Sequence, residues 1–337
     1  MASSNFDNMR RRWLRTVLAA GAAASGLAAG GVQAQPQDWP TRPVRLILGF
    51  AAGSSGDLLA RMIAPRLEAL WKQPVIVENK PGAGSVIATE YVAFSNDNHV
   101  FLVGSLSSLL PKYTTRNLRY DPVTDLVPVY RLIDYEFVIV TNAKTAERAG
   151  TLQEMKRLGQ STQGVFFAGT GPASIFNLSM AVVNRSLGIR YATIDHNNVP
   201  AMTMAVLRND AQLMVNAPGA IRQYFDSGEL RPLAVFGRER YPSMPDVPTV
   251  YEAGYKGDFL PLSWHSLFAP KAMPAAIVER VGSDLRTVLS DAELRKSIET
   301  RLTGTVPASS PAQFRKEYLE DAKAWQAAFI ALDYKPE

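Results

Sequence analysis

The stretch "LILGFAAGSSGDLLARMIAPRLEAL", residues 46–70, decides the fold because three local patterns follow one another in it. It begins with an apolar run of strand length and ends in a segment whose apolar residues recur at helical spacing. The loop between them, Gly49 to Asp57, consists mainly of small residues. A strand that leads through such a loop into a helix is typical of an α/β unit, and the helix start offers free N–H groups to an anion.

The same order of strand, small-residue loop and helix recurs along the chain. The sequence predicts strands at residues 44–50, 74–79, 99–105, 137–142, 164–170 and 230–237. Loops of the same kind lie at residues 49–57, 79–84, 168–174 and 215–220. Strands that alternate with helices at this spacing predict parallel sheets with right-handed crossovers. Because two of the loops lie early and two in the middle, we expect two lobes whose loops face one cleft.

The first 34 residues have the pattern of an export signal. A basic segment with Arg10, Arg11, Arg12 and Arg15 precedes a small-residue apolar run over 17–32, and Val32-Gln33-Ala34 fits a cleavage site. The run is short and weakly apolar for a membrane span. The sequence therefore predicts a released, periplasmic protein, and it leaves twin-arginine and Sec export both open.

Composition excludes several other functional classes. The 337 residues are 47% hydrophobic and 20% charged, as in a globular protein with a core. The signal carries four arginines and one aspartate, a net +3, so the formal charge of +5 falls to 5 − 3 = +2 without it. That small charge gives no support for nucleic-acid binding. With no cysteine and three scattered histidines, we expect no metal and no cofactor.

Catalytic spacing is also missing from the sequence. The chain contains neither G-x-G-x-x-G nor G-x-x-x-x-G-K-[ST], and it lacks the G-x-S-x-G of serine hydrolases. We therefore predict no catalytic residues and no enzyme. Asp57 keeps two interpretations, as the N-cap of the helix that follows the first loop or as a contact to a ligand.

The last predicted helix carries an aromatic stripe. Ser310 is expected as its N-cap and Pro311 as its first residue. At helical spacing, the stripe consists of Phe314, Tyr318, Trp325, Phe329 and Leu332. Such a stripe predicts packing against the body of the protein rather than a cofactor site.

Several long motifs resemble one known family. They are "PTRPV" at 40–44 with Phe50, Gly53, Asp57, Ala60 and Arg61 after it, "KQPVIVENKPGAG" at 72–84, "YDPVTDLVPV" at 120–129, "GELRPLAVFGRERYPSMPDVPTVYEAG" at 228–254 and "WHSLFAP" at 264–270. In this order they make residues 39–337 similar to the Bug/TctC-type substrate-binding proteins of tripartite tricarboxylate transport systems.

The resemblance implies a two-lobed type II periplasmic-binding-protein fold, each lobe a mainly parallel sheet flanked by helices. The expected division is an export signal over 1–34, a first lobe over 35–135 and 259–337, and a second lobe over 136–258. The implied function is that of an exported, monomeric solute receptor. It would close around a small organic, carboxylate-bearing ligand and deliver it to integral-membrane transporter subunits. An exported hydrolase or lyase and a ligand sensor that signals to a membrane partner are the alternatives.

The resemblance also implies candidate ligand-binding residues. In the first lobe, main-chain N–H groups of two loops would hold a carboxylate; these residues are Gly53, Ser54, Ser55, Asp57, Gly82, Ala83 and Gly84. In the second lobe a Ser/Thr-Gly loop would select the rest of the ligand; its residues are Thr170, Gly171 and Ser174. Further candidates near the strand ends and loops are Ser105, Asn177, Asp195 and Asn216.

This chain departs from the family pattern in the second lobe. Where the family has a Pro-Tyr-Lys-Gly segment, residues 194–197 read Ile-Asp-His-Asn. A cation is lost there and Asp195 can add a negative charge. The hypothesis is therefore a ligand with one carboxylate and a polar or neutral far end.

Overall fold

A computed structural model of the protein describes residues 39–162, 164–172, 174–257 and 263–336. The predicted export signal and the predicted boundary between the lobes at residues 258 and 259 lie outside these ranges. Residues Pro40–Glu337 form one unit, which contains both sheets described below.

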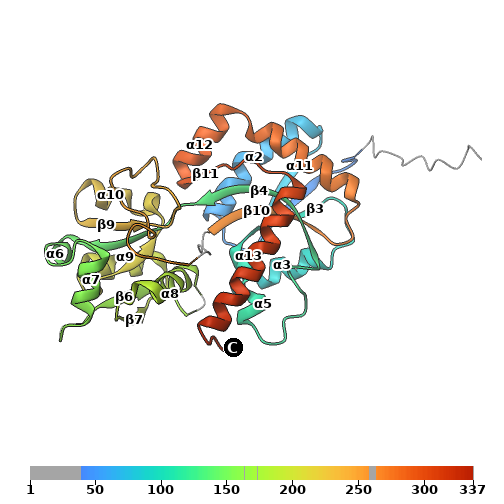
Figure 1. The fold of residues 1–337 in the computed structure, drawn as a ribbon. Helices are drawn as coiled ribbons and strands as arrows, with labels where there is room; N and C mark the ends of the chain where they lie inside the picture. Colours follow the sequence, from blue (N-terminus) through green and yellow to red (C-terminus); the bar gives the residue numbers. More distant parts are fainter. Residues whose placement is uncertain (1–38, 163, 173, 258–262, 337) are drawn as a thin grey trace, which may run out of the picture. The chain divides into compact units, whose positions relative to one another are not determined.

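The first lobe is built on a six-stranded sheet with the order β11-β4-β10-β3-β1-β2 (Figure 1). Its strands are β1 (Val44–Leu48), β2 (Val75–Asn79), β3 (Val100–Ser105), β4 (Leu126–Tyr135), β10 (Ser263–Pro270) and β11 (Gly304–Thr305). β1 pairs in parallel with β2 and β3. β10 lies antiparallel between β3 and β4, and β11 pairs antiparallel with β4.

The second lobe contains five shorter strands. They are β5 (Val138–Asn142), β6 (Phe166–Gly169), β7 (Ala192–Asp195), β8 (Met214–Asn216) and β9 (Leu230–Val235). β5 lies antiparallel between β8 and β9, whereas β6 and β7 pair in parallel. Two backbone hydrogen bonds, Ala168 N–H to Leu213 O and Leu213 N–H to Phe166 O, join β6 to the residue before β8.

The expectation of mainly parallel sheets is wrong. The first lobe's sheet is mixed, and in the second lobe β8, β5 and β9 pair antiparallel while β6 and β7 pair in parallel. The reason is the path of the chain between the lobes. β5 leaves the crossing and runs away from the first lobe, so β8, which runs back, pairs with it in the opposite direction. β10 starts at the crossing in the same way and must run against β3.

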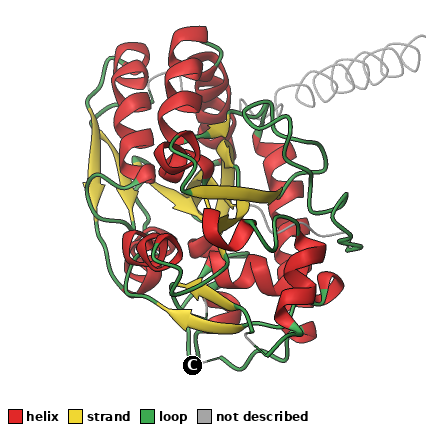
Figure 2. Cartoon of the chain, turned by 90° about the vertical axis from the view of Figure 1, so that its left-hand side faces the viewer, coloured by secondary structure: helices red, strands yellow, loops and turns green. Residues whose placement is uncertain are grey.

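Helices flank the sheets of both lobes (Figure 2). Those of the first lobe are α2 (Ser55–Trp71), η1 (Ala83–Ser85), α3 (Val86–Ala93), α4 (Leu106–Leu109), α5 (Pro111–Thr114), α11 (Ala275–Leu289), α12 (Ala292–Leu302) and α13 (Pro311–Ala331). Those of the second lobe are α6 (Ala143–Ala146), α7 (Leu152–Gly159), α8 (Ile175–Leu187), α9 (Val199–Leu207), η2 (Pro218–Ile221) and α10 (Arg222–Asp226). No helix in the described part of the chain is long and apolar enough to cross a membrane.

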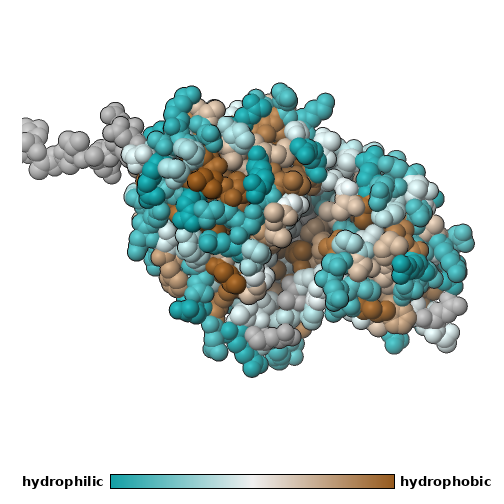
Figure 3. All heavy atoms as spheres, turned by 180° about the vertical axis from the view of Figure 1, so that it is seen from behind, coloured by the Kyte–Doolittle hydropathy of each residue, from teal (hydrophilic) through white to brown (hydrophobic). Residues whose placement is uncertain are grey.

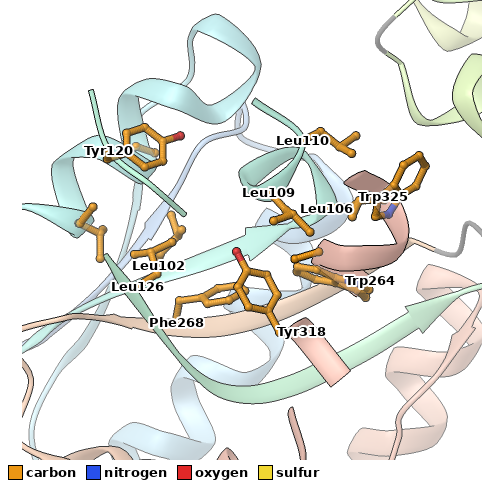
Figure 4. Close-up of a cluster of buried hydrophobic side chains, with 14 of the residues drawn as sticks. Leu102, Leu106, Leu109, Leu110, Tyr120, Leu126, Trp264, Phe268, Tyr318 and Trp325 are labelled. Atoms are coloured by element: carbon orange, nitrogen blue, oxygen red, sulfur yellow. The ribbon is translucent and has the colours of Figure 1, made fainter. Parts of the chain in front are cut away.

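The C-terminal helix α13 confirms the prediction for its start and its stripe. The Ser310 side chain accepts a hydrogen bond from Gln313 N–H, and Pro311 is the first helical residue. Phe314 and Tyr318 pack against Phe268 with ring centroids 5.3 and 5.1 Å apart, and Trp264 lies in the same cluster (Figure 4). The stripe is therefore core, as the helical spacing predicts.

Strand register places the loops of the two lobes opposite each other. In the first lobe, β10 sets Ser105 and Tyr135 at one edge of the sheet, because His265 pairs with Ser105 and Ser263 pairs with Tyr135. In the second lobe, Asn216 pairs with Val138, so β8 ends where β5 begins. Only two residues separate β4 from β5, so these edges face each other. A hollow between two masses of side chains is visible in Figure 3.

Candidate functional site

Asp57 orders the first loop, Gly49–Asp57, through the hydrogen bonds of its carboxylate. Ser54 is the N-cap of α2 and accepts a hydrogen bond from Asp57 N–H, so Asp57 is the third helical residue and not the cap. Its carboxylate accepts hydrogen bonds from Gly53 N–H at 2.9 Å, from Arg61 Nε at 3.0 Å and from Asn79 Nδ2 at 3.0 Å. The side chain is 2% exposed. The hydrogen bond from Arg61 is the main reason that the pKa of Asp57 is lowered.

The second loop has an unusual backbone. Gly82, Ala83, Gly84 and Ser85 have φ angles of 143°, 45°, 61° and 81° in succession. Ala83 and Ser85 are not glycine, so their conformations are strained. Such strain is typical of residues that hold a functional loop in a fixed conformation.

Ser85 lies between the two first-lobe loops. It is 1% exposed, and its Oγ has no hydrogen-bond partner in the described residues. A Cβ on Gly49 would lie 2.0 Å from this Oγ, so Gly49 is needed for the close approach of the loops. A buried hydroxyl without a partner is costly, which makes it a candidate for a ligand or water contact.

His265 and Tyr135 form the floor beside the first loop. Their ring centroids are 5.1 Å apart, and His265 also contacts Phe50 at 5.7 Å. Burial lowers the pKa of His265 to about 4, so the ring is neutral at physiological pH, and its Nδ1 has no hydrogen-bond partner in the described residues. Burial raises the pKa of Tyr135 to about 12, and its hydroxyl has no hydrogen-bond partner in the described residues.

Ser105 also lies at this edge, opposite His265 in the sheet. It is the N-cap of the short helix α4, and its Oγ is 2.7 Å from the hydroxyl of Ser107. The residue is 6% exposed. Ser105 thus holds its own turn, next to the floor formed by His265 and Tyr135.

The candidates of the second-lobe loop, Ala168–Ser174, belong to one hydrogen-bond network. Ser174 is the N-cap of α8 and its hydroxyl donates to Asn177 Oδ1, which also accepts from Thr170 N–H at 3.1 Å. Asp195 Oδ1 accepts from Gly171 N–H at 3.0 Å and from Asn177 Nδ2 at 2.9 Å. The network brings together all five candidates of this loop.

Asn216 faces the interior of the second lobe. Its amide nitrogen donates to Thr203 Oγ1, its amide oxygen accepts from Ala217 N–H, and the residue is 1% exposed. The side chain therefore fixes the turn after β8.

The structure joins the predicted residues into two groups, one on each facing edge. The sequence reasoning missed Asn79, Arg61, Ser85, Tyr135 and His265 as parts of the first group. The motif that contains Asn79 and the helical spacing of Arg61 from Asp57 were visible signals. The described residues include no cluster of His, Cys, Asp or Glu that could hold a metal ion.

A separate cavity of about 470 Å³ lies between the lobes near β11. Residues from η2 and α10, from 243–247 and from the end of α12 line it. None of the predicted site residues lines it. Thr303, which lines it, precedes Gly304, and Gly304 pairs with Tyr135 in the sheet.

A family model, curated proteins and solved structures that are similar to this chain agree with one another. Residues 59–331 match the family model of the tripartite tricarboxylate transporter family receptor. A UPF0065 protein of Bordetella bronchiseptica is 32% identical over 77% of this chain and 76% of its own length. The structure of the periplasmic binding protein BugD has a TM-score of 0.73 at 25% identity, covering 89% of this chain and 100% of that one.

The structure of MatC from Rhodopseudomonas palustris with bound malate is similar as well. Its TM-score is 0.71 at 25% identity, and the match covers 86% of this chain and 99% of that chain. Together these matches confirm the two-lobed periplasmic-binding-protein fold. The chain belongs to the tripartite tricarboxylate transporter receptor family, the Bug/TctC-type binding proteins.

Proposed function

We propose that this protein is an exported receptor that binds a small organic carboxylate between its lobes. In this proposal it delivers the solute to integral-membrane subunits of a tripartite tricarboxylate-type transporter. The observation that carries the proposal is the buried Ser85 Oγ, which has no hydrogen-bond partner in the described residues and lies between the two first-lobe loops. The start of α2, a helix of 17 residues, adds a partial positive charge at the same place.

Each group of residues has a role in this proposal. Main-chain N–H groups and hydroxyls of the first-lobe loops bind the carboxylate, and Asp57 positions the first of these loops through Gly53. The second-lobe loop binds the remainder of the solute. Closure is favoured only when the solute engages both lobes, because only then does it bind the closed state better than the open one.

The malate bound in MatC supports a carboxylate as the solute class. The chain shares 25% of its residues with that protein over nearly the whole fold. The family description as a receptor and the similarity to the periplasmic binding protein BugD support binding without catalysis.

The proposal includes the export route and the division of the chain. Residues 1–34 would direct a monomer to the periplasm, with lobe 1 over 35–135 and 259–337 and lobe 2 over 136–258. Sequencing the N-terminus of the secreted protein tests the first part. A mature chain that begins near Gln35 is expected, and a retained N-terminus contradicts export by cleavage.

Isothermal titration calorimetry with a panel of short carboxylates tests the binding function. The panel contains monocarboxylates and dicarboxylates of four to six carbons, and the matching neutral diamides serve as controls. At least one carboxylate is expected to bind and the diamides are not. If no carboxylate binds, or if a diamide binds as well as its acid, the proposed function is wrong.

The Ser85→Ala variant tests the site itself. Affinity for the tightest carboxylate should fall by about tenfold or more, because a hydrogen bond to a charged group contributes about 1.5–3 kcal/mol. The melting temperature should not fall, because the lost hydroxyl has no partner in the described residues. Ser266→Ala is the matched control, since Ser266 Oγ is also buried and without a partner there but lies inside the sheet. Equal affinities of wild type and Ser85→Ala would contradict this site.

A further inference from the structure

The two lobes begin their facing helices with the same arrangement of an Asp and an Asn, but with the two residues exchanged. In the first lobe the third residue of α2 is Asp57, and the strand that follows, β2, ends at Asn79. In the second lobe the third residue of α8 is Asn177, and β7, which follows it, ends at Asp195.

The hydrogen bonds of the two arrangements correspond. In each lobe the carboxylate accepts from the asparagine amide and from the N–H of a glycine with positive φ, Gly53 or Gly171. In each lobe a serine N-cap precedes, Ser54 or Ser174. We call these two sets the Asp57–Asn79 clamp and the Asn177–Asp195 clamp.

The clamps differ in charge. Asp57 is buried and forms an ion pair with Arg61 at 3.0 Å. Asp195 is exposed and has no ion pair within 4.0 Å in the described part of the chain. The first-lobe loops therefore keep the positive potential of their helix start, whereas the second-lobe loop carries a net negative charge.

Asp195 also accepts hydrogen bonds from the N–H donors that a second ligand carboxylate would need. Its Oδ1 already accepts hydrogen bonds from Gly171 N–H and from the side-chain amide of Asn177 at the start of α8. A ligand anion there would have to displace this oxygen and would face its charge across a short distance. Like charges at such separations are strongly unfavourable in a partly dry cleft.

We infer that the second lobe selects a hydrogen-bond donor, so that the ligand carries one carboxylate and, at its far end, an amide or an ammonium group. The inference rests on the proposed function and narrows its solute class. The sequence predicts a ligand with a polar or neutral far end. The Asn177–Asp195 clamp adds that this end must donate a hydrogen bond, and it identifies Asp195 as the acceptor. Asp195 thereby acts as the charge selector of the second lobe.

Competitive binding with three compounds of each chain length tests the inference. The compounds are the dicarboxylate, its monoamide and the corresponding ω-amino acid, at lengths of four to six carbons. Wild type should bind the monoamide or the amino acid at least about tenfold more tightly than the dicarboxylate. In Asp195→Asn this ratio should fall to about threefold or less, mainly because the dicarboxylate binds better.

Two further variants separate charge from structure. Asp210→Asn removes the same charge from an exposed residue that precedes β8. Because Asp210 lies before the start of β8 and the cleft edge is at its end, the affinity ratio of monoamide to dicarboxylate should not change. The double variant Asn177→Asp with Asp195→Asn rebuilds the order found in the first lobe and keeps the charge. It should retain the preference of wild type and a similar melting temperature.

The outcomes distinguish this inference from the proposed function. If carboxylates bind and the dicarboxylate is the best ligand of wild type, the inference is wrong and the proposed function stands. An unchanged ratio in Asp195→Asn, or a double variant that behaves like Asp195→Asn, also overturns the inference. If none of the compounds binds, the proposed function falls and the inference falls with it.

Discussion

The carboxylate of Asp57 connects three parts of the first lobe that are distant in sequence or conformation. It accepts from the backbone of Gly53, from the side chain of Arg61 one turn along α2, and from Asn79 at the end of β2. Since it is 2% exposed, it acts on the loop and not on the cleft surface. Its effect on binding is therefore expected to be indirect, through the order of the loop.

Asp57→Ala should lower both stability and affinity. Three donors lose their acceptor, so the free energy of unfolding should fall by about 1–3 kcal/mol, measured by chemical denaturation. Affinity for the tightest carboxylate should fall by about tenfold, because the loop is no longer preorganised. Asp291→Ala is the control: Asp291 caps α12 and should cost stability without changing affinity. Lost affinity at unchanged stability would instead show a direct ligand contact.

At the residue scale the sequence predicts the loops better than the partners within them. Small residues after an apolar strand are visible in the sequence, and all of the predicted loop residues lie at the two facing edges. The interaction of Asn177 with Asp195 is not visible, because it depends on β6 and β7 lying side by side. Ser85 and His265 could not be found either, since what distinguishes them is a missing partner in the folded core.

Helix α13 carries a half-buried acid, Asp321, whose ionisation opposes folding. Asp321 accepts a hydrogen bond from Trp264 Nε1 at 3.0 Å and lies 3.8 Å from Arg131. Burial raises its pKa to about 6, although Arg131 works in the opposite direction. Because the folded-state pKa is higher than the unfolded value, the folded protein binds more protons between these two values, and stability falls as the pH rises through this window.

The Asp321→Asn variant isolates this effect. Relative to the variant, wild type should be more stable at pH 5 than at pH 7.5 by about 1 kcal/mol. Urea denaturation at both pH values measures the difference. Glu320→Gln, which removes an exposed carboxylate from the same helix, should show no such change. A difference between wild type and Asp321→Asn that does not depend on pH would contradict the raised pKa.

At the scale of elements, the sequence predicts where strands and helices lie better than how strands pair. The runs at 44–50, 74–79 and 99–105 are all strands in the structure, and α13 begins at its predicted cap. The predicted parallel direction is confirmed for β1 with β2 and β3 and for β6 with β7, but it is wrong for β10, β11, β8 and β9, because an apolar run has no direction. The direction of β10 and β8 follows from where the chain crosses between the lobes, which no local pattern encodes.

At the scale of the whole molecule, one tyrosine fixes the segment of the second lobe that follows the crossing from β4. Tyr241 Oη accepts a hydrogen bond from Phe137 N–H at 3.2 Å and donates to Phe236 O at 2.7 Å. Phe137 lies between β4 and β5, and Phe236 follows β9, which leaves the second lobe's sheet. A direct bond from Phe236 N–H to Phe137 O at 2.8 Å completes the connection. These contacts resist relative motion of the two segments.

Tyr241→Phe should loosen this crossing. Phe137 N–H and Phe236 O lose a partner, so the melting temperature should fall. The radius of gyration without solute, measured by small-angle X-ray scattering, should exceed that of wild type, and saturating solute should restore it. Tyr251→Phe removes a buried hydroxyl that has no partner in the described residues and should change neither quantity. An unchanged radius in Tyr241→Phe would show that other contacts fix the lobes.

The apolar face of α8 has a consequence for the rate of binding. Leu178 belongs to the same buried cluster as Trp264 and Trp325 of the first lobe, and Ile175 packs against that cluster. We expect a solute that binds between the lobes to enter after this contact separates. The observed association rate should therefore rise with solute concentration and then level off at the rate of opening. Tryptophan fluorescence in a stopped-flow experiment would report it, since the separation changes the surroundings of both indole rings.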